Sequence, residues 1–354
     1  MPIVGLRGTL PQSGYGRVAD YAGVAVLKSI RQDGSYLMRV LVVGAGVIGS
    51  FNAARLRDAG QDVTLLARGR RLAELREHGV VLEDFRIGRR TTTRVPLVER
   101  IGPEDDYDLA LVIVRRNQIP SVLPMLAENR RIPSVLFLGN NAAGAQEMVQ
   151  ALGRERVLTG MMNAGGERDG YVVRYIWSRR FALRFGELDD APTPRTEAIV
   201  RMFRSAGLPA RVVKNVDAYQ KTHAAGVPAL AGALYMAGGD IRRLAHTPEL
   251  LRLFVQGYRE AVRALRADGT PLKPSASWLV EWIPMPALLL GLRLFFNTRL
   301  AVVGGERHAN AAPDEMKELA DEFREILRRS GHASPASDVL FAQVDARAGV
   351  GAEA

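Results

Sequence analysis

The sequence predicts two domains, an α/β domain with a largely parallel sheet followed by an all-α domain. At 354 residues the chain exceeds the usual size of one domain. After Met38, continuous apolar strand patterns alternate with helical patterns, which indicates a sheet covered on both faces. From Asp217 onward the apolar period is helical throughout. We therefore divide the chain into an N-terminal extension (1–37), a nucleotide-binding α/β domain (38–214), a helical domain (215–335) and a C-terminal tail (336–354).

The expected elements follow from periodicity and from capping signals. Strands are expected at 39–43, 62–67, 108–114 and 133–138, and helices at 47–59, 70–78, 117–129 and 143–152. Extended pieces at 171–175 and 180–185 should lengthen the sheet at its edge, before a helix at 194–206 and a strand at 210–213. In the second domain, helices are expected at 248–267, between Thr247 and Gly269, and at 313–329, before Gly331.

The glycine-rich run that follows the first strand predicts a dinucleotide site. Gly44 permits a tight turn, Gly46 allows a pyrophosphate to approach the backbone, and Gly49 lets the helix pack closely on the strand. Amides at the start of the helix would point at the phosphates, where the helix dipole favours negative charge. We expect the following residues at the cofactor: Gly44, Ala45, Gly46, Val47, Ile48 and Gly49.

The end of the second strand favours NADP(H) over NAD(H). A site that selects NAD usually has a carboxylate there to accept hydrogen bonds from the ribose hydroxyls. This chain instead has Arg68, with Arg70 and Arg71 behind it, and a guanidinium can donate charge-assisted hydrogen bonds to a 2′-phosphate. Arg115 and Arg116 are expected near the same adenosine end.

Composition argues against several other classes of protein. The chain has no cysteine, and its five histidines lack HxxxH or HExxH spacing, so we expect no metal site. The net charge of +10 comes from dispersed arginines, which favours anionic small molecules over nucleic acid. No export signal is evident, and the absence of cysteine fits a cytoplasmic protein. Pro284, Pro286 and several charges interrupt the apolar stretch 278–303, so we expect buried, bent helices there rather than a membrane span.

From Met38 to Gly331 the chain resembles the ketopantoate reductase (2-dehydropantoate 2-reductase) family, whose members have a Rossmann-like domain and a helical domain. The resemblance rests on the glycine run, Arg68, the segments 112–118 and 137–141, and the Phe-Gly-Glu sequence at 185–187. It implies cofactor contacts from Asn140, beside the nicotinamide ribose, and from Gly166. It implies another from Arg115, where the family usually has lysine.

The resemblance also implies the chemistry, which is reduction of a 2-oxo acid by NADPH as in pantothenate biosynthesis. Lys221 corresponds to the family's proton donor, and Glu315 to the glutamate that holds the lysine and a substrate hydroxyl. A carbonyl that gains a hydride develops negative charge on its oxygen, which a nearby ammonium can stabilise and protonate.

Departures from the family pattern concern the substrate. Ala225 and Ala229 stand where the family commonly has asparagines that contact ketopantoate, so the substrate is expected to differ and to be more apolar. His308 and Asn310 could supply new polar contacts. The alternatives are a dehydrogenase of another hydroxy or amino acid and a non-catalytic NADP(H)-binding sensor or scaffold. The expected partner is a small carbonyl compound, without membrane contact, and a homodimer is the assembly to consider.

Overall fold

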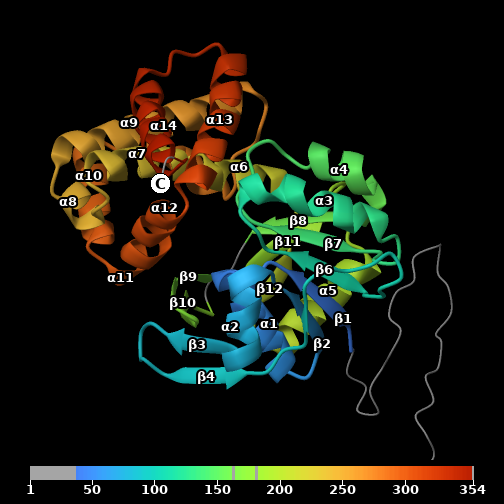
Figure 1. Cartoon of the computed structure of the whole chain (residues 1–354). Coiled ribbons are helices and arrows are strands. Elements are labelled where there is room, and N and C mark those ends of the chain that lie inside the picture. The colour runs from blue at the N-terminus through green and yellow to red at the C-terminus, as the bar shows by residue number, and fades with distance from the viewer. Residues whose placement is uncertain (1–36, 162–163, 180–181, 353–354) are drawn as a thin grey trace, which may run out of the picture.

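The computed structural model describes residues 37–161, 164–179 and 182–352. Figure 1 shows an α/β domain and a helical domain, with the helical domain packed across one end of the sheet. The expected class, a Rossmann-like domain followed by an all-α region, is confirmed. The predicted extension at 1–37 lies almost wholly outside the described residues.

The main sheet has eight strands in the order β12-β11-β8-β7-β6-β1-β2-β5. All neighbouring strands are parallel except β11 and β8, which run antiparallel. The strands are β1 (Arg39–Val43), β2 (Asp62–Leu66), β5 (Leu97–Val98), β6 (Leu109–Val112), β7 (Val135–Leu138), β8 (Val157–Met161), β11 (Leu183–Glu187) and β12 (Ala210–Val212). The chain leaves β1 for β2 on one side, and β6 and β7 lie on the other. The carboxyl ends of β1 and β6 therefore mark the switch point where such sheets bind ligands.

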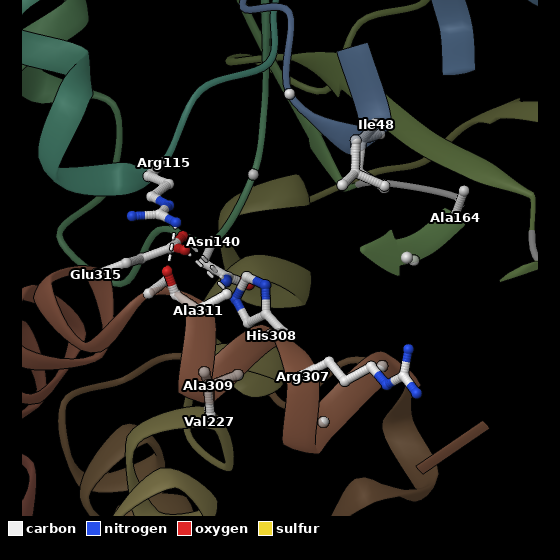
Figure 2. A pocket seen from close by; sticks show the side chains of 18 of the residues that line it. Ile48, Arg115, Asn140, Ala164, Val227, Arg307, His308, Ala309, Ala311 and Glu315 are labelled. Atoms are coloured by element: carbon white, nitrogen blue, oxygen red, sulfur yellow. Dashed lines mark hydrogen bonds and ion pairs between the residues drawn. The ribbon is translucent and has the colours of Figure 1, made fainter. Parts of the chain in front are cut away.

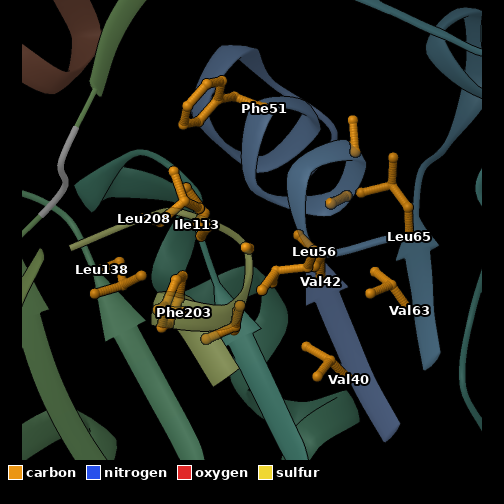
Figure 3. Close-up of a cluster of buried hydrophobic side chains, with 14 of the residues drawn as sticks. Val40, Val42, Phe51, Leu56, Val63, Leu65, Ile113, Leu138, Phe203 and Leu208 are labelled. Carbon is orange, nitrogen blue, oxygen red and sulfur yellow. The ribbon is translucent and has the colours of Figure 1, made fainter. Parts of the chain in front are cut away.

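Helices cover both faces of this sheet. Alternate residues of β1 point to opposite sides, so Val40 and Val42 join one core while Leu41 and Val43 join the other. The first core is shown in Figure 3, where Phe51 and Phe203 come from covering helices. The covering helices are α1 (Val47–Asp58), α2 (Gly69–His78) and α5 (Pro194–Ser205) on that side, and α3 (Ile119–Glu128) and α4 (Gln146–Leu152) on the other. Short 3₁₀ turns are η1 (Arg116–Gln118) and η2 (Arg154–Arg156).

A second sheet of four strands corrects one prediction. Residues 172–177 form β10 and do not extend the main sheet, although β11 does so as expected. The order is β4-β3-β10-β9, with β3 (Val80–Asp84), β4 (Arg90–Thr93), β9 (Ala164–Asp169) and β10 (Val172–Trp177). β10 turns away from the main sheet because Tyr175 packs on Phe51 of α1, with ring centroids 4.8 Å apart. This packing carries β9 over the glycine turn.

The helical domain has its own apolar core. Its elements are α6 (Val216–Ala224), α7 (Val227–Met236), α8 (Ile241–Ala245), α9 (Pro248–Ala267), η3 (Ser275–Glu281), α10 (Met285–Phe296), α11 (Arg299–Ala301), the π-helical η4 (Val302–Glu306), α12 (Arg307–Ala311), α13 (Pro313–Ser330) and α14 (Pro335–Ala352). The stretch expected as a tail forms most of α14. Leu340, Phe341 and Val344 of that helix are buried in the domain core.

The stretch 278–303 is helical and bent at the prolines, as expected, but the prediction that it is buried is wrong. Trp282 is 74% exposed, and Leu290 and Leu294 are more than half exposed. Leu288, Leu289 and Leu292 of α10 pack on the domain core, whereas Leu290 and Leu294 are exposed. Within the described residues, no helix alone is long and apolar enough to cross a membrane; η3 and α10 qualify only as a pair bent by 118°.

Candidate active site

The turn from β1 into α1 has the geometry that a dinucleotide requires. Gly44 has φ +108°, and a Cβ at Gly49 would lie 1.8 Å from the carbonyl oxygen of Gly44. Above Gly46 the space is open, with nothing within 4 Å of the position a Cβ would take. No side chain caps the N-terminus of α1 and no acidic residue lies in its first turn, so its amides are left for an anion.

Arg68 follows β2 as predicted and lines the cleft. Its guanidinium is exposed and makes only long contacts, 3.4 Å to the Glu99 carbonyl and 3.8 Å to Met125 Sδ. Arg71 has a different role, because it is buried and donates to the Ala45 carbonyl at 3.1 Å. Arg71 therefore stabilises the glycine turn through its bond to Ala45, whereas the exposed guanidinium of Arg68 can contact a ligand in the cleft.

Gly166 and Asn140 border the same space from two sheets. Gly166 lies on β9, where a Cβ would come within 2.3 Å of the Arg174 carbonyl and 2.8 Å of the Val47 side chain. Asn140 lies just after β7 and is buried. Both residues line the cleft, together with Gly44, Ala45, Gly46, Val47, Ile48, Arg68 and Arg115.

One cleft of about 1840 Å³ runs from the glycine turn to the helical domain. It exceeds the usual volume of a small-molecule pocket, so it has room for a dinucleotide and a second molecule. The residues that line the cleft differ between its two ends. The α/β end presents backbone and arginines, whereas the helical end is apolar, with Leu230, Phe254, Tyr258, Leu292, Phe295, Leu300 and Val303.

A polar cluster lies where these two halves meet, and Figure 2 shows it. Glu315, near the start of α13, is 3% exposed. Its Oε1 accepts from Asn140 Nδ2 at 3.4 Å and from the Arg116 amide at 3.4 Å, and its Oε2 lies 3.3 Å from Nε2 of His308. Predicted residues from both domains thus meet here, and they are joined by a histidine that the sequence had singled out only as an extra polar group.

The two arginines after β6 pair with residues of the helical domain. Arg115 Nη1 pairs with Asp314 at 3.1 Å, and its Nη2 donates to the Ala311 carbonyl at 2.5 Å. Arg116 is buried and pairs with Glu322 at 2.5 Å and with Glu147 at 3.2 Å. Arg115 still lines the cleft, so a cofactor contact from it stays a prediction.

The structure does not bring Lys221 to Glu315. Lys221 Nζ pairs with Asp217 one helical turn back, at 2.7 Å, and the lysine is not among the residues that line the cleft. Ala225 and Ala229, the other two positions of the same helical stripe, are buried in the domain core instead. The predicted proton donor and the two positions where the family has asparagines therefore lie off the cleft together.

The other side of α6 and α7 faces the cleft. The residues that line the cleft from it are Gln220, His223, Val227 and Leu230. Gln220 explains this orientation, because its Nε2 donates to the carbonyls of Gly139 and Gly160 at 3.1 Å each. The bonds fix the rotation of α6 against two strand ends. His223 is open to the cleft but enclosed by its walls, and this burial, with nearby His308, lowers the pKa of His223. The ring therefore stays neutral at neutral pH.

Residues 40–190 match the sequence model of the ketopantoate reductase PanE/ApbA family. This segment is therefore similar to that family. The 2-dehydropantoate 2-reductase of Pyrococcus horikoshii is 26% identical over 182 residues, which are 51% of this chain and 57% of that protein. The corresponding protein of Archaeoglobus fulgidus is also 26% identical, over 51% of this chain and 58% of its own length. The chain thus spans little more than half of the length of these curated relatives.

Solved structures share the fold over a longer stretch. The PanE/ApbA family ketopantoate reductase of Ralstonia eutropha superposes with a TM-score of 0.71 at 21% identity, covering 88% of this chain and 98% of that one. D-mandelate dehydrogenase, solved with NADH and anilino(oxo)acetate, superposes with a TM-score of 0.72 at 17% identity over the same shares. Both domains therefore have the ketopantoate reductase architecture.

Proposed function

We propose that the protein is an NADP(H)-dependent reductase of a 2-oxo acid or a related carbonyl compound. The observation that supports this most is the single cleft, which joins an open glycine turn at one end to a buried carboxylate–histidine–asparagine cluster and an apolar chamber at the other. The similarity of residues 40–190 to the family model and the relatives named above support the same reaction class.

The residues present fit a dinucleotide. The open space above Gly46 and the uncapped amides of α1 suit a pyrophosphate, and β9 passes close by with a glycine where a side chain would collide. A bound reduced nicotinamide would supply a hydride to the carbonyl carbon. The chain's own contribution is to position the substrate beside Asn140 and Glu315 and to exclude water with the apolar walls.

The apolar end of the cleft supports a substrate with a bulky apolar group. Phe254 and Tyr258 from α9 and Leu292 and Phe295 from α10 line it. At the two positions where the family has asparagines, this chain has Ala225 and Ala229, which are buried in the core. No side-chain amide there can hydrogen-bond to a hydroxyl group of the substrate. We therefore expect ketopantoate to be a poorer substrate than a 2-oxo acid with an aromatic or branched apolar side chain.

Arg68→Ala is expected to weaken NADPH binding by about 10- to 100-fold, because a charge-assisted hydrogen bond to the 2′-phosphate is lost. NADH has no such phosphate, so its dissociation constant should change by less than about threefold. Titration of each nucleotide by fluorescence or calorimetry measures this. Arg70→Ala is the matched control, since Arg70 is exposed, pairs with Glu74 and does not line the cleft. Equal affinity of the wild-type protein for NADH and NADPH would contradict NADP(H) selectivity.

One observation favours a second candidate, a non-catalytic NADP(H)-binding sensor. Lys221, the residue that the family resemblance makes the proton donor, is paired with Asp217 away from the cleft. A sensor would bind NADPH tightly and consume none in the presence of any carbonyl compound, whereas a reductase would consume it.

A further inference from the structure

His308 lines the cleft beside Glu315, where the two domains meet. It lies on α12 and has a side chain 35% exposed toward the cleft. Figure 2 shows its ring beside Asn140 and Glu315, at the carboxyl edge of the parallel sheet. A nicotinamide held by the glycine turn would reach this edge, since ligands of such sheets lie outside the carboxyl ends of the strands.

Glu315 and His308 form a close ion-pair contact, in which the buried Nε2 of His308 makes no hydrogen bond to a described residue. Nε2 of the imidazole is 3.3 Å from Glu315 Oε2, and the other carboxylate oxygen is held by the Asn140 amide and the Arg116 backbone. A carboxylate fixed in this way orients a histidine and stabilises its positive charge. Neither ring nitrogen of His308 hydrogen-bonds to a described residue, so Nδ1 can meet a substrate oxygen while Nε2 stays beside Glu315.

We propose that His308, oriented by Glu315, is the general acid that protonates the carbonyl oxygen in this protein. The proposal rests on the proposed reductase function and replaces Lys221 in that role. The competing ammonium lies on the stripe of α6 that turns away from the cleft. The stripe that faces the cleft carries an imidazole, His223, in its place.

The step balances without a further reactant. The carbonyl carbon accepts a hydride from the reduced nicotinamide and forms a C–H bond, while its oxygen takes the proton from Nδ1 of the His308 imidazolium. The carbon–oxygen double bond becomes a single bond, the carbonyl is reduced to an alcohol and the nicotinamide is oxidised. The imidazole is left neutral and regains a proton from water through the open side of the cleft. In the reverse direction neutral His308 accepts the alcohol proton.

The charged groups around His308 set the expected pH dependence. They are Glu315 of α13, His223 of α6, Arg115 before η1, Glu306 of η4, which accepts from the Ile241 amide, and the Arg307–Glu167 pair that joins α12 to β9. Glu315 is the one carboxylate in contact with the imidazole. Reduction needs the imidazolium, so its rate should fall as the pH rises, whereas oxidation of the alcohol should speed up.

His308→Asn is expected to lower kcat for reduction by about 10²- to 10⁴-fold, which is the usual contribution of a general acid. Asparagine keeps a polar group but transfers no proton at neutral pH, so the alkaline fall in rate should disappear as well. The NADPH dissociation constant and the melting temperature should stay close to those of the wild type, which separates a lost acid from a misfolded cleft. His332→Asn is the matched control, because His332 is exposed and does not line the cleft.

Glu315→Gln tests the positioning role. This variant should lower kcat for reduction while the KM and the NADPH dissociation constant stay close to those of the wild type, because the imidazole loses the carboxylate beside it. A purely structural role would lower the melting temperature and leave kcat unchanged. That outcome would overturn the positioning role.

Binding of anilino(oxo)acetate to the NADPH complex gives a readout without turnover. Its 2-oxo group should accept a hydrogen bond from the His308 imidazolium, so affinity should weaken with rising pH in the wild type and become independent of pH in His308→Asn. Retention of more than about a tenth of kcat in His308→Asn, with loss of turnover in Lys221→Ala, would overturn the proposal alone. Absence of any carbonyl-dependent turnover in the wild-type protein would overturn the reductase function, and the acid role with it.

Discussion

The Gly49→Ala protein is expected to lose dinucleotide binding and part of its stability. A methyl group at this position would lie 1.8 Å from the Gly44 carbonyl oxygen, which is backbone and cannot rotate away. The turn between β1 and α1 must open to accept it, at a cost of about 1–3 kcal/mol for an overpacked site. Because the amides that face the phosphates belong to the same turn, NADPH affinity should fall by about 10- to 100-fold or more.

The control for this variant is Gly291→Ala in α10. Gly291 is exposed, and no atom lies within 4 Å of the position of the added methyl group, so this substitution should preserve NADPH affinity. It should also stabilise the helix slightly, since alanine favours a helix interior over glycine. Calorimetry and thermal unfolding of both variants measure the difference. Wild-type NADPH affinity in Gly49→Ala would show that the turn does not bind the cofactor as described.

Arg116→Ala is expected to destabilise the protein by about 3–5 kcal/mol, the usual cost of leaving one partner of a buried ion pair alone. Arg116 and Glu322 are both buried, and their pair, at 2.5 Å, joins η1 of the α/β domain to α13 of the helical domain. Burial raises the pKa of Glu322, and the Arg116 guanidinium and the Ala142 amide oppose that rise. Without the arginine, the carboxylate must either stay charged and unpaired or take up a proton.

Two further variants make the effect of Arg116 specific. Arg116→Ala combined with Glu322→Gln should recover part of the lost stability, because the amide oxygen still accepts from the Ala142 backbone while the buried charge is gone. Arg131→Ala removes an exposed arginine that pairs with Glu104 and should cost less than about 1 kcal/mol. Urea unfolding measures all three. A loss below about 1 kcal/mol in Arg116→Ala would mean that this pair does not hold the domains together.

The cofactor half of the cleft could be predicted because its signals are local. Gly49 packs against the backbone of Gly44, five residues earlier, and Arg68 lies two residues after the end of β2. Strand bounds such as Arg39–Val43 follow from continuous apolar runs, which any sheet covered on two faces requires. Local sequence signals do not predict the second sheet, because β10 pairs with a strand far earlier in the chain. Val172 of β10 is opposite Val81 of β3.

The substrate half depends on a rotation that spacing cannot reveal. At helical spacing, Lys221, Ala225 and Ala229 fall on one side, and Gln220, His223 and Val227 fall on the roughly opposite side. Either side can face a cleft. The choice is made by the bonds from Gln220 to the strand-end carbonyls of Gly139 and Gly160, which exist only in the folded protein.

Long-range contacts also explain why the partners of Arg115 and Arg116, and the helix α14, could not be predicted from the sequence. Arg115 and Arg116 meet their partners, Asp314 and Glu322, some 200 residues later in the chain. The segment that became α14 is rich in alanine and glycine, so its apolar pattern is weak, and its burial comes from packing on α7, α9 and α13. In α10 the apolar pattern is strong, yet several of its apolar side chains are exposed. An apolar sequence alone therefore does not decide which residues become buried.

The central claim, that this protein is an NADP(H)-dependent reductase, is tested most directly by following loss of NADPH absorbance with a panel of 2-oxo acids. The panel should include ketopantoate and 2-oxo acids with aromatic and branched apolar side chains. We predict consumption of NADPH that depends on the oxo acid, with a higher kcat/KM for the apolar members than for ketopantoate. Tight NADPH binding without consumption in the presence of any member of the panel would contradict the claim.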